Sequence, residues 1–290
     1  MKRCIWLILL LFVFICGINA QESDTSAVKH WKFGTVFNAS LSQTALSNWA
    51  GGGENSLALS GLSNSTANYQ KDKISWENSF EFAYGIIKQG DASAEKSDDK
   101  IEISSKLGRE IKTHLNLTGD VEFRSQFSPG YEKFTDPVTN VEKEILVSEF
   151  LAPGYVTSTI GLEYKPGEEF FVLVSTLTGK TTIVLNNDLS DAGAFGVKAG
   201  EKIRNELGSY LKSMVKVPLM ENITFQTKLS LFSAYKNPDK VDVSWETLLL
   251  LQVNKYITTN FNTHLIYDED VTTKTQFKEV LSVGVTFELK

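Results

Sequence analysis

The chain ends in Glu279-Val-Leu-Ser-Val-Gly-Val-Thr-Phe-Glu-Leu-Lys290, and this stretch decides the expected fold. Every second residue from Leu281 to Leu289 is apolar, and serine, glycine, threonine and glutamate lie between them. A two-residue period predicts a β-strand with one apolar face and one polar face. Such a strand needs partners on both sides, because an open edge leaves backbone groups unpaired.

The same two-residue period recurs along the chain and predicts twelve strands. Outside the terminus it is clearest at residues 74–84, where only Asn78 interrupts the apolar face. Residues 56–62 and 169–185 alternate less cleanly. The expected strands cover residues 31–42, 56–62, 74–84, 100–109, 114–127, 155–164, 169–185, 207–217, 223–231, 243–253, 257–267 and 279–290.

The connections between these segments alternate in length. Short ones are expected near residues 111, 166–167, 218–222 and 254–256, and longer ones at 89–99, 128–149, 186–206, 234–240 and 269–275. Outer-membrane barrels have short periplasmic turns, long external loops and an even number of strands. We therefore predict an all-β fold, an antiparallel up-and-down transmembrane β-barrel of about 12 strands, closed by pairing of the last strand with residues 31–41.

A secreted β-sandwich or a lipocalin-like barrel is the alternative, because the period does not say which face points inward. Three observations favour the membrane barrel. The polar faces carry many charges, which suits a water-filled lumen, and the chain is too long for an eight-stranded soluble barrel. Aromatic residues also lie near the expected strand ends, as in an interfacial girdle. These residues are Trp76, Tyr84, Trp245, Tyr267 and Phe287.

The N-terminus has the composition of a secretory signal peptide. Lys2 and Arg3 precede an apolar run at residues 5–15, and Ala20 precedes a polar residue. The run is shorter than the roughly 20 apolar residues of a membrane-spanning helix. We predict a cleaved signal peptide at residues 1–20, a short periplasmic lead-in at 21–30 and the barrel at 31–290. The expected location is the outer membrane of a Gram-negative bacterium.

Composition limits the possible partners. Cys4 and Cys16 both lie in the expected signal peptide, which excludes a disulfide scaffold and thiolate metal sites in the mature chain. Without Lys2 and Arg3, 27 basic side chains face 35 acidic ones, so the net charge is −8 and nucleic acid is not an expected partner. We expect no cofactor and no metal. The expected partners are outer-membrane lipid and the barrel-assembly machinery, which would engage the C-terminal strand.

Several fragments resemble a known family. They are residues 46–55 (LSNWAGGGEN), 76–78 (WEN), 84–85 (YG), 96–100 (KSDDK), 123–131 (FRSQFSPGY), 148–153 (SEFLAP) and 267–268 (YD). The chain is similar here to a domain-of-unknown-function family of predicted outer-membrane proteins from Bacteroidota-type bacteria. The resemblance spans most of the mature chain and implies location and architecture. It implies no activity and no catalytic residues.

The lumen is the expected functional region, because charged side chains on the polar faces project into it. A barrel of about 12 strands lies between filled eight-stranded barrels and open porins of 16 or more, so we expect a narrow, partly filled lumen. Charges of both signs favour ion pairs between strands. The lumen-facing candidates are Glu77, Glu81, Glu102, Lys106, His114, Glu122, Arg124, Glu163, Lys212, Lys216, Lys228, Glu246, His264 and Glu288.

The glycine-rich segment Trp49, Gly51, Gly52 and Gly53 is expected in an external loop. Consecutive glycines permit positive φ and close backbone approach, so the segment is either a compact turn anchored by Trp49 or a loop that meets a ligand. We favour the compact turn.

Three functions remain open at this point. The favoured one is a non-enzymatic, narrow channel or transporter for a small solute or a lipid-like molecule. The alternative is a structural or adhesive barrel whose external loops, chiefly 128–149 and 186–206, bind a partner. The weakest is a lipid hydrolase that uses His114 or His264. No G-x-S-x-G motif supports it, and both histidines are expected inside the lumen.

Overall fold

The computed structural model describes residues 30–47 and 54–289. The predicted signal peptide at 1–20, residues 21–29 of the lead-in, the glycine-rich segment Trp49–Gly53 and Lys290 lie outside the described residues.

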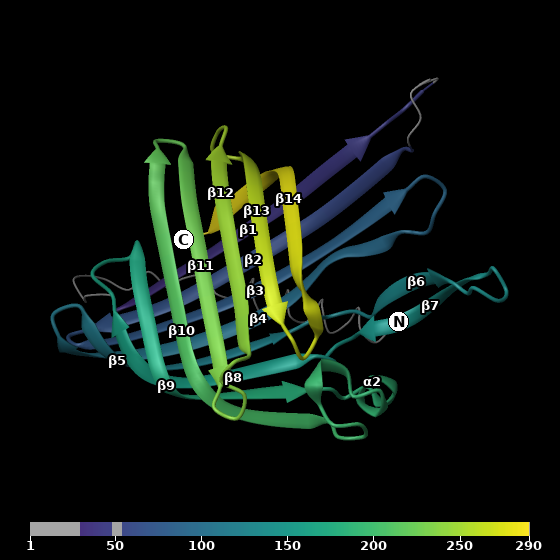
Figure 1. Ribbon diagram of the computed structural model, residues 1–290. Helices are drawn as coiled ribbons and strands as arrows, with labels where there is room; N and C mark the ends of the chain where they lie inside the picture. The colour runs from purple at the N-terminus through teal and green to yellow at the C-terminus, as the bar shows by residue number, and fades with distance from the viewer. Residues whose placement is uncertain (1–29, 48–53, 290) are drawn as a thin grey trace, which may run out of the picture. The chain divides into compact units, whose positions relative to one another are not determined.

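The described part of the chain is almost entirely β-structure (Figure 1). The strands are β1 Trp31–Thr44, β2 Ser56–Lys71, β3 Ile74–Gln89, β4 Glu95–Lys112, β5 Leu115–Ser125, β6 Gly130–Thr135, β7 Glu142–Ser148, β8 Gly154–Tyr164, β9 Phe170–Ile183, β10 Ile203–Met220, β11 Ile223–Ala234, β12 Val241–Gln252, β13 Ile257–Asp268 and β14 Thr272–Leu289. The two short helices are α2 Asn187–Asp191 and the 3₁₀ turn η1 Ala194–Gly196. In the described ranges, no helix is long and apolar enough to cross a membrane.

Twelve of the strands form one closed antiparallel barrel, as predicted. Their order around the barrel is β1-β14-β13-β12-β11-β10-β9-β8-β5-β4-β3-β2. The predicted closure is also confirmed, because Thr35–Leu41 of β1 pair with Val283–Leu289 of β14. The hairpin β6-β7 forms a separate two-stranded sheet in the connection between β5 and β8, where only a loop was expected.

The connections alternate in length around most of the barrel. At one end, Asp72–Lys73, Thr113–His114 and Glu221–Asn222 are two-residue links. The opposite end carries the longer connections, including the β6-β7 hairpin and the link between β9 and β10. The long loop expected at residues 269–275 is wrong. β13 and β14 are joined by only three residues, because β14 already begins at Thr272, which pairs with Asp268.

The outer and inner faces of the barrel differ in polarity. Large apolar side chains such as Phe33, Leu107 and Leu281 are exposed on the outside. Polar groups on this face are paired locally: the Trp76 indole N–H donates to Ser105 (2.9 Å), whose hydroxyl donates to Asn78 (2.8 Å). Charged side chains line the inside. An apolar outside around a polar inside is the reverse of a soluble β-barrel and matches a membrane-spanning one.

A bulge in β9 changes which residues face the lumen. Leu173 and Ser175 are buried on the inner face, and after the bulge the buried residues are Thr178 and Lys180. The register with β8 and with β10 shifts at this point. The Ser175 hydroxyl fills the irregularity by donating to the carbonyl of Ile160 (2.7 Å). The extra residue explains why alternation in 169–185 is unclear, because a bulge inverts the two-residue phase.

Glycines permit close strand contact beside these irregularities. A Cβ at Gly161 would collide with the backbone carbonyl of Val174, and one at Gly208 would collide with that of Ser233. Only glycine can occupy such positions without moving the neighbouring strand.

The two longest outer connections pack together. Val184, Leu189 and Val197 of the β9–β10 link form a buried apolar cluster with Ala152, which precedes β8. Leu146 of β7 packs against this cluster. The outer connections therefore have a small core of their own.

Candidate functional site in the lumen

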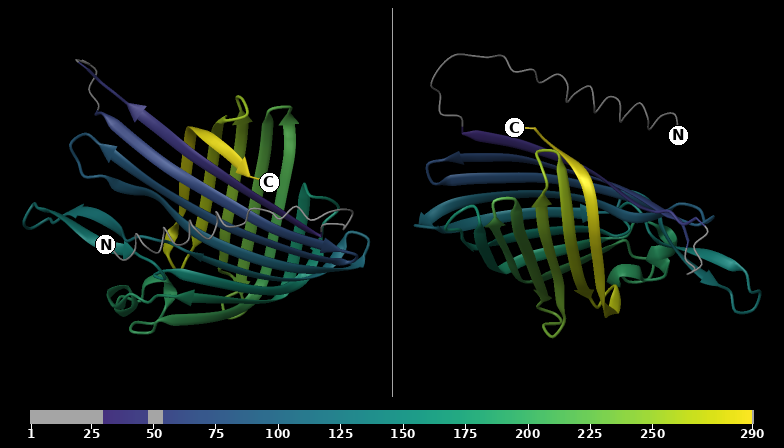
Figure 2. Two further views of the ribbon diagram at one scale, coloured as in Figure 1. Left: turned by 180° about the vertical axis from the view of Figure 1, so that it is seen from behind. Right: turned by 90° about the horizontal axis from the view of Figure 1, so that it is seen from above.

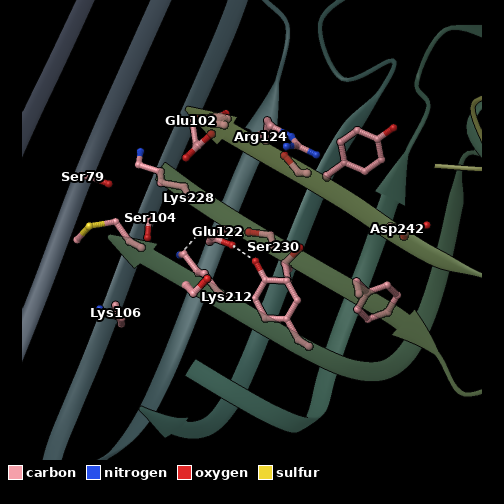
Figure 3. A pocket seen from close by; sticks show the side chains of 18 of the residues that line it. Ser79, Glu102, Ser104, Lys106, Glu122, Arg124, Lys212, Lys228, Ser230 and Asp242 are labelled. Atoms are coloured by element: carbon pink, nitrogen blue, oxygen red, sulfur yellow. Dashed lines mark hydrogen bonds and ion pairs between the residues drawn. The ribbon is translucent and has the colours of Figure 1, made fainter. Parts of the chain in front are cut away.

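A cavity of about 360 Å³ lies inside the barrel. Its charged lining has both signs, and the charges come from strands far apart in the chain (Figure 3). The charged lining residues are Glu77, Glu102, Lys106, Glu122, Arg124, Lys180, Lys212, Lys228, Asp242, Glu246 and Asp268. Five aromatic residues contribute to the wall, namely Tyr155, Phe171, Tyr210, Phe232 and Tyr267.

Lys212 on β10 connects to two carboxylates on β5. Its Nζ lies 2.9 Å from Asp120 Oδ2 and also pairs with Glu122, to which the Tyr210 hydroxyl donates at 3.0 Å. Figure 3 shows the contacts of Glu122 as dashed lines. Strands β9 and β8 lie between β10 and β5, so this cluster crosses part of the lumen.

Lys106 on β4 is buried between carboxylates. Its Nζ lies 2.6 Å from Glu163 of β8 and 3.0 Å from Glu77 of β3, and it also lies over the Phe171 ring. Glu163 is only 1% exposed. A buried cation of this kind requires close partners, because desolvating a charge is expensive.

Lys165 extends the same cluster from the short turn after β8. Its Nζ lies 2.5 Å from Glu77 and 3.2 Å from Glu168. Burial by itself lowers the pKa of Lys165, but the hydrogen bond and charge of Glu77 outweigh it and raise the pKa. Lys165 therefore adds a fixed positive charge at this end of the barrel.

Lys100 connects opposite walls of the barrel. It pairs with Glu81 (2.7 Å) and Glu102 (3.2 Å) beside it, and with Glu246 of β12 at 3.6 Å. Five strands separate β4 from β12 in either direction around the barrel. The pair between Lys100 and Glu246 therefore spans the lumen and narrows it.

Lys180 forms a fourth cluster. Its Nζ lies 2.6 Å from Asp242 of β12 and 3.1 Å from Asp268 of β13, and it also approaches the rings of Tyr155 and Phe232. The β9 bulge makes this cluster possible, because it turns Lys180 to the inner face.

Two cations in the cavity wall are not held in this way. Arg124 lies opposite Glu102 in the strand register, and Lys228 lies opposite Glu246. Within the described ranges neither forms an ion pair, although Arg124 lies over the Tyr155 ring. The carboxylates opposite both cations are instead paired with Lys100. Arg124 and Lys228 therefore line the cavity without an ion pair of their own within the described ranges.

The predicted lumen residues occupy several environments. Most line the cavity, whereas Glu81, Glu163 and His264 lie in the ion-pair clusters around it. Lys216 and Glu288 lie near strand ends, are exposed and do not contribute to the cavity lining.

His114 is a correction to the sequence prediction. It lies in the turn between β4 and β5 with φ 63°, and not on a lumen-facing strand. Histidine is among the residues that tolerate this left-handed conformation, so it suits a two-residue turn.

Sequence patterns missed several residues of the site. Lys180 was missed because the bulge inverts the phase. Tyr155 and Tyr210 are in phase with the polar residues of their strands, but they were missed because the lumen candidates were limited to charged residues and histidine. Lys100 and Asp120 do lie on predicted polar faces, so strand alternation could have placed them in the lumen. Their particular partners could not be found that way, because the pairs join strands that are not neighbours.

One group in the lumen resembles part of a catalytic triad. Ser244 Oγ lies 2.9 Å from His264 Nε2, and Glu246 lies 3.7 Å from the same nitrogen. A triad needs the carboxylate on the other ring nitrogen, where it orients the imidazole. The arrangement does not have this geometry. Among the described residues, no group of three or more His, Cys, Asp or Glu is placed to hold a metal ion.

Comparison with known sequences gives a match over part of the chain. Residues 41–131 match a family model described as "Protein of unknown function (DUF3078)". This supports the expected resemblance to a domain of unknown function. No curated protein sequence matches the chain.

Solved structures similar to the chain are distant in sequence. An outer membrane channel from Pseudomonas putida F1 is 12% identical, with a TM-score of 0.40, covering 93% of this chain and 98% of its own. The translocator domain of an autotransporter from Neisseria meningitidis is 7% identical, with a TM-score of 0.39, covering 99% and 96%. The NanC porin is 7% identical, with a TM-score of 0.38, covering 88% and 97%. The closed barrel of this chain is established by its own strand pairing.

Proposed function

We propose that this chain is a non-enzymatic outer-membrane β-barrel channel that passes small polar solutes. The observation that carries the proposal is the cavity of about 360 Å³, lined by charges of both signs, inside a barrel with an apolar outer face. Such a lumen offers a polar path through a membrane, because the charged groups replace part of a solute's hydration.

The lumen favours narrow, selective passage over a wide general pore. The Lys100–Glu246 pair joins opposite walls, while Arg124 and Lys228 keep their positive groups available. A solute that carries an anionic group matches this arrangement of charges, and so does a zwitterionic solute that also carries a positive group.

Planar-bilayer recording of the refolded full-length mature protein tests the channel. We expect discrete conductance steps that are smaller than those of open porins. Absence of both ionic conductance and solute entry into liposomes, for protein that shows the heat-sensitive gel mobility of a folded barrel, contradicts the proposal.

Lys100→Met tests whether the ion pair across the lumen limits passage. We expect a larger conductance and a shift towards cations, because Glu81, Glu102 and Glu246 lose a shared positive partner. Lys71→Met is the matched control, since this exposed lysine lies at the end of β2 outside the cavity lining. Equal conductance and selectivity in both variants means that the pair does not form the constriction.

Partner binding by the outer connections is a second candidate function. The β6-β7 hairpin carries exposed apolar side chains, including Tyr131, Ile145 and Val138, which is 90% exposed. Exposed apolar clusters commonly mark contact surfaces. Replacing residues 131–147 by a short glycine-serine link tests this. It removes Leu146, which packs against the apolar cluster, but leaves Val184 and Leu189 of that cluster in place. The change should abolish partner capture without loss of the folded barrel.

A further inference from the structure

The closing pair of strands is much shorter than the neighbouring pairs. β1 pairs with β14 through seven residue pairs, from Thr35–Leu289 to Leu41–Val283. By contrast, β1 pairs with β2 through 14 and β2 with β3 through 16. In the described part of the chain, Thr272 and Gln276–Ser282 of β14 pair through the backbone with β13 and not with β1.

The two strands separate before either one ends. β1 continues to Thr44, and β14 extends back to Thr272, so Ser42 and Ser282 would form the next pair in the register. No such pair forms among the described residues. Figures 1 and 2 show the first part of β14 running in a different direction from β1.

An ion pair joins this part of β14 to β4 and not to β1. Lys278 Nζ of β14 lies 2.7 Å from Asp98 of β4, although β1, β2 and β3 lie between these strands around the barrel. The outer half of β14 therefore bends towards β4. Because β1 continues along β2, no backbone pairing joins these stretches of β1 and β14 among the described residues, which leaves an opening in the hydrogen-bonded wall.

The outer side of this opening is apolar. Leu281 is 66% exposed and Phe277 is 63% exposed, and Leu41 is also exposed on β1. Glu279 is the nearest charged residue on the outward face of β14, so the opening begins where the apolar band from Leu281 to Leu289 ends. A band of nine residues is about the length that a tilted strand needs to cross the hydrocarbon.

The inner side of the opening carries no charge on β1 or β2. The inward-facing residues there are Ser40, Ser42, Ala58, Ser60 and Leu62, by register with Asn38 and Asn64. Val280 on the inner face of β14 is 37% exposed. An apolar rim that leads to an uncharged wall with hydroxyl groups suits a molecule with one apolar chain and one polar end.

Unpaired strand edges at the boundary of the hydrocarbon need hydrogen-bonding partners other than lipid tails, which cannot accept or donate hydrogen bonds. An amphiphile at the membrane boundary can satisfy these backbone groups and also cover the apolar rim. Its polar end can form hydrogen bonds with the free backbone groups, and its chain can contact Leu281 and Phe277. We propose that the gap between β1 and β14 is a lateral opening through which a single-chain amphiphile passes between the outer leaflet and the lumen.

Lipid quenching measures the opening directly. The only cysteines are Cys4 and Cys16, so a cysteine-reactive fluorophore can be placed at one position in the mature barrel. In vesicles of brominated phosphatidylcholine, we expect Val280→Cys to be quenched at least half as strongly as the outward-facing Leu281→Cys. Ser230→Cys, in the cavity wall, is the inward-facing control and should be quenched little. Quenching at Val280→Cys no greater than at Ser230→Cys overturns the proposal.

Crosslinking measures whether the opening is used. Ser42→Cys with Ser282→Cys, joined by a short bis-maleimide, bridges the opening, whereas Asn38→Cys with Thr286→Cys bridges strands that are already paired. We expect the first crosslink to abolish uptake of a fluorescent fatty acid from the bilayer and the second to leave it unchanged. Equal uptake in both crosslinked proteins contradicts lateral passage. Ionic conductance is recorded on the same samples, so failure of the channel proposal is detected separately.

Discussion

Two parts of the inner wall differ in chemistry. β4, β5, β8, β9 and β10 carry charged side chains, and several of their ion pairs pass over intervening strands. β1 has no charged residue from Phe33 to Thr44, and β2 has none from Ser56 to Gln70. Their inner face is instead connected by hydrogen bonds such as Asn38 to Thr286 (2.8 Å).

The charged and uncharged parts of the wall therefore contribute differently to the structure. Buried charges fix distant strands relative to one another, because each charge needs partners that only other strands supply. Hydroxyl and amide groups tolerate either a neighbouring strand or water, so a wall built from them can end its pairing early. β1 and β14 separate on the uncharged side of the barrel.

The largest expected effect is on the charged wall. Glu163→Ala should destabilise the barrel by about 3 kcal/mol, because Lys106 is buried and loses its nearest carboxylate. Urea unfolding of the refolded protein measures this. Glu168→Ala, which removes an exposed carboxylate, is the control and should have little effect. Equal loss of stability in both variants removes the distinction between buried and exposed pairs.

The uncharged wall should be less sensitive. Asn38→Ala removes hydrogen bonds to Thr286 (2.8 Å) and Thr258 (3.2 Å), and we expect a loss of about 1.5 kcal/mol. The same unfolding experiment provides the comparison. A loss as large as that of Glu163→Ala means that the two walls do not differ in their contribution to stability.

A third change should stabilise the charged wall. The hydroxyl oxygen of Thr118 on β5 is fully buried and has no hydrogen-bond partner in the described structure. Thr118→Val keeps the shape and removes the unsatisfied group, so we expect a gain of about 1 kcal/mol in unfolding free energy. Thr181→Val, whose hydroxyl is bonded to Asn205 (2.8 Å) at an exposed site, should show no gain.

The smallest effect is expected at the tip of the β6-β7 hairpin, where an ion pair is exposed. The hydrogen bond from Lys143, together with those from the backbone N–H groups of Val138 and Thr139, lowers the pKa of Asp136 below its ordinary value of 3.8. The carboxylate therefore stabilises the tip above the ordinary pKa, and this contribution is lost as the pH falls through the lowered value.

Amide hydrogen exchange of residues 138–141 between about pH 5 and about pH 2, corrected for intrinsic rates, measures this change. Asp136→Asn should remove the pH dependence while the barrel strands stay protected. A pH dependence that persists in this variant assigns the effect to another group.

Much of the barrel follows from local patterns. Each of the twelve predicted segments overlaps a barrel strand, because one lipid-facing and one water-facing side impose alternation wherever the ladder is regular. The prediction failed where the ladder is irregular or ends. Lys180 was not predicted to face the lumen, because it follows the β9 bulge. His114 lies in the turn before β5 and not on a strand. A short link follows Asp268 where a longer loop was expected.

The sequence by itself determined the two faces of the closing strand, since alternation of Leu281 to Leu289 with polar residues is a local property. It also determined that the strand would pair with β1. Only the tertiary structure decided how far that pairing runs. The pairing stops at Leu41 and Val283, and beyond that point Lys278 of β14 meets Asp98 of β4. A contact between residues so far apart in the chain leaves no local pattern. The same reason applies to Lys100 and Glu246, which meet only because the barrel is closed.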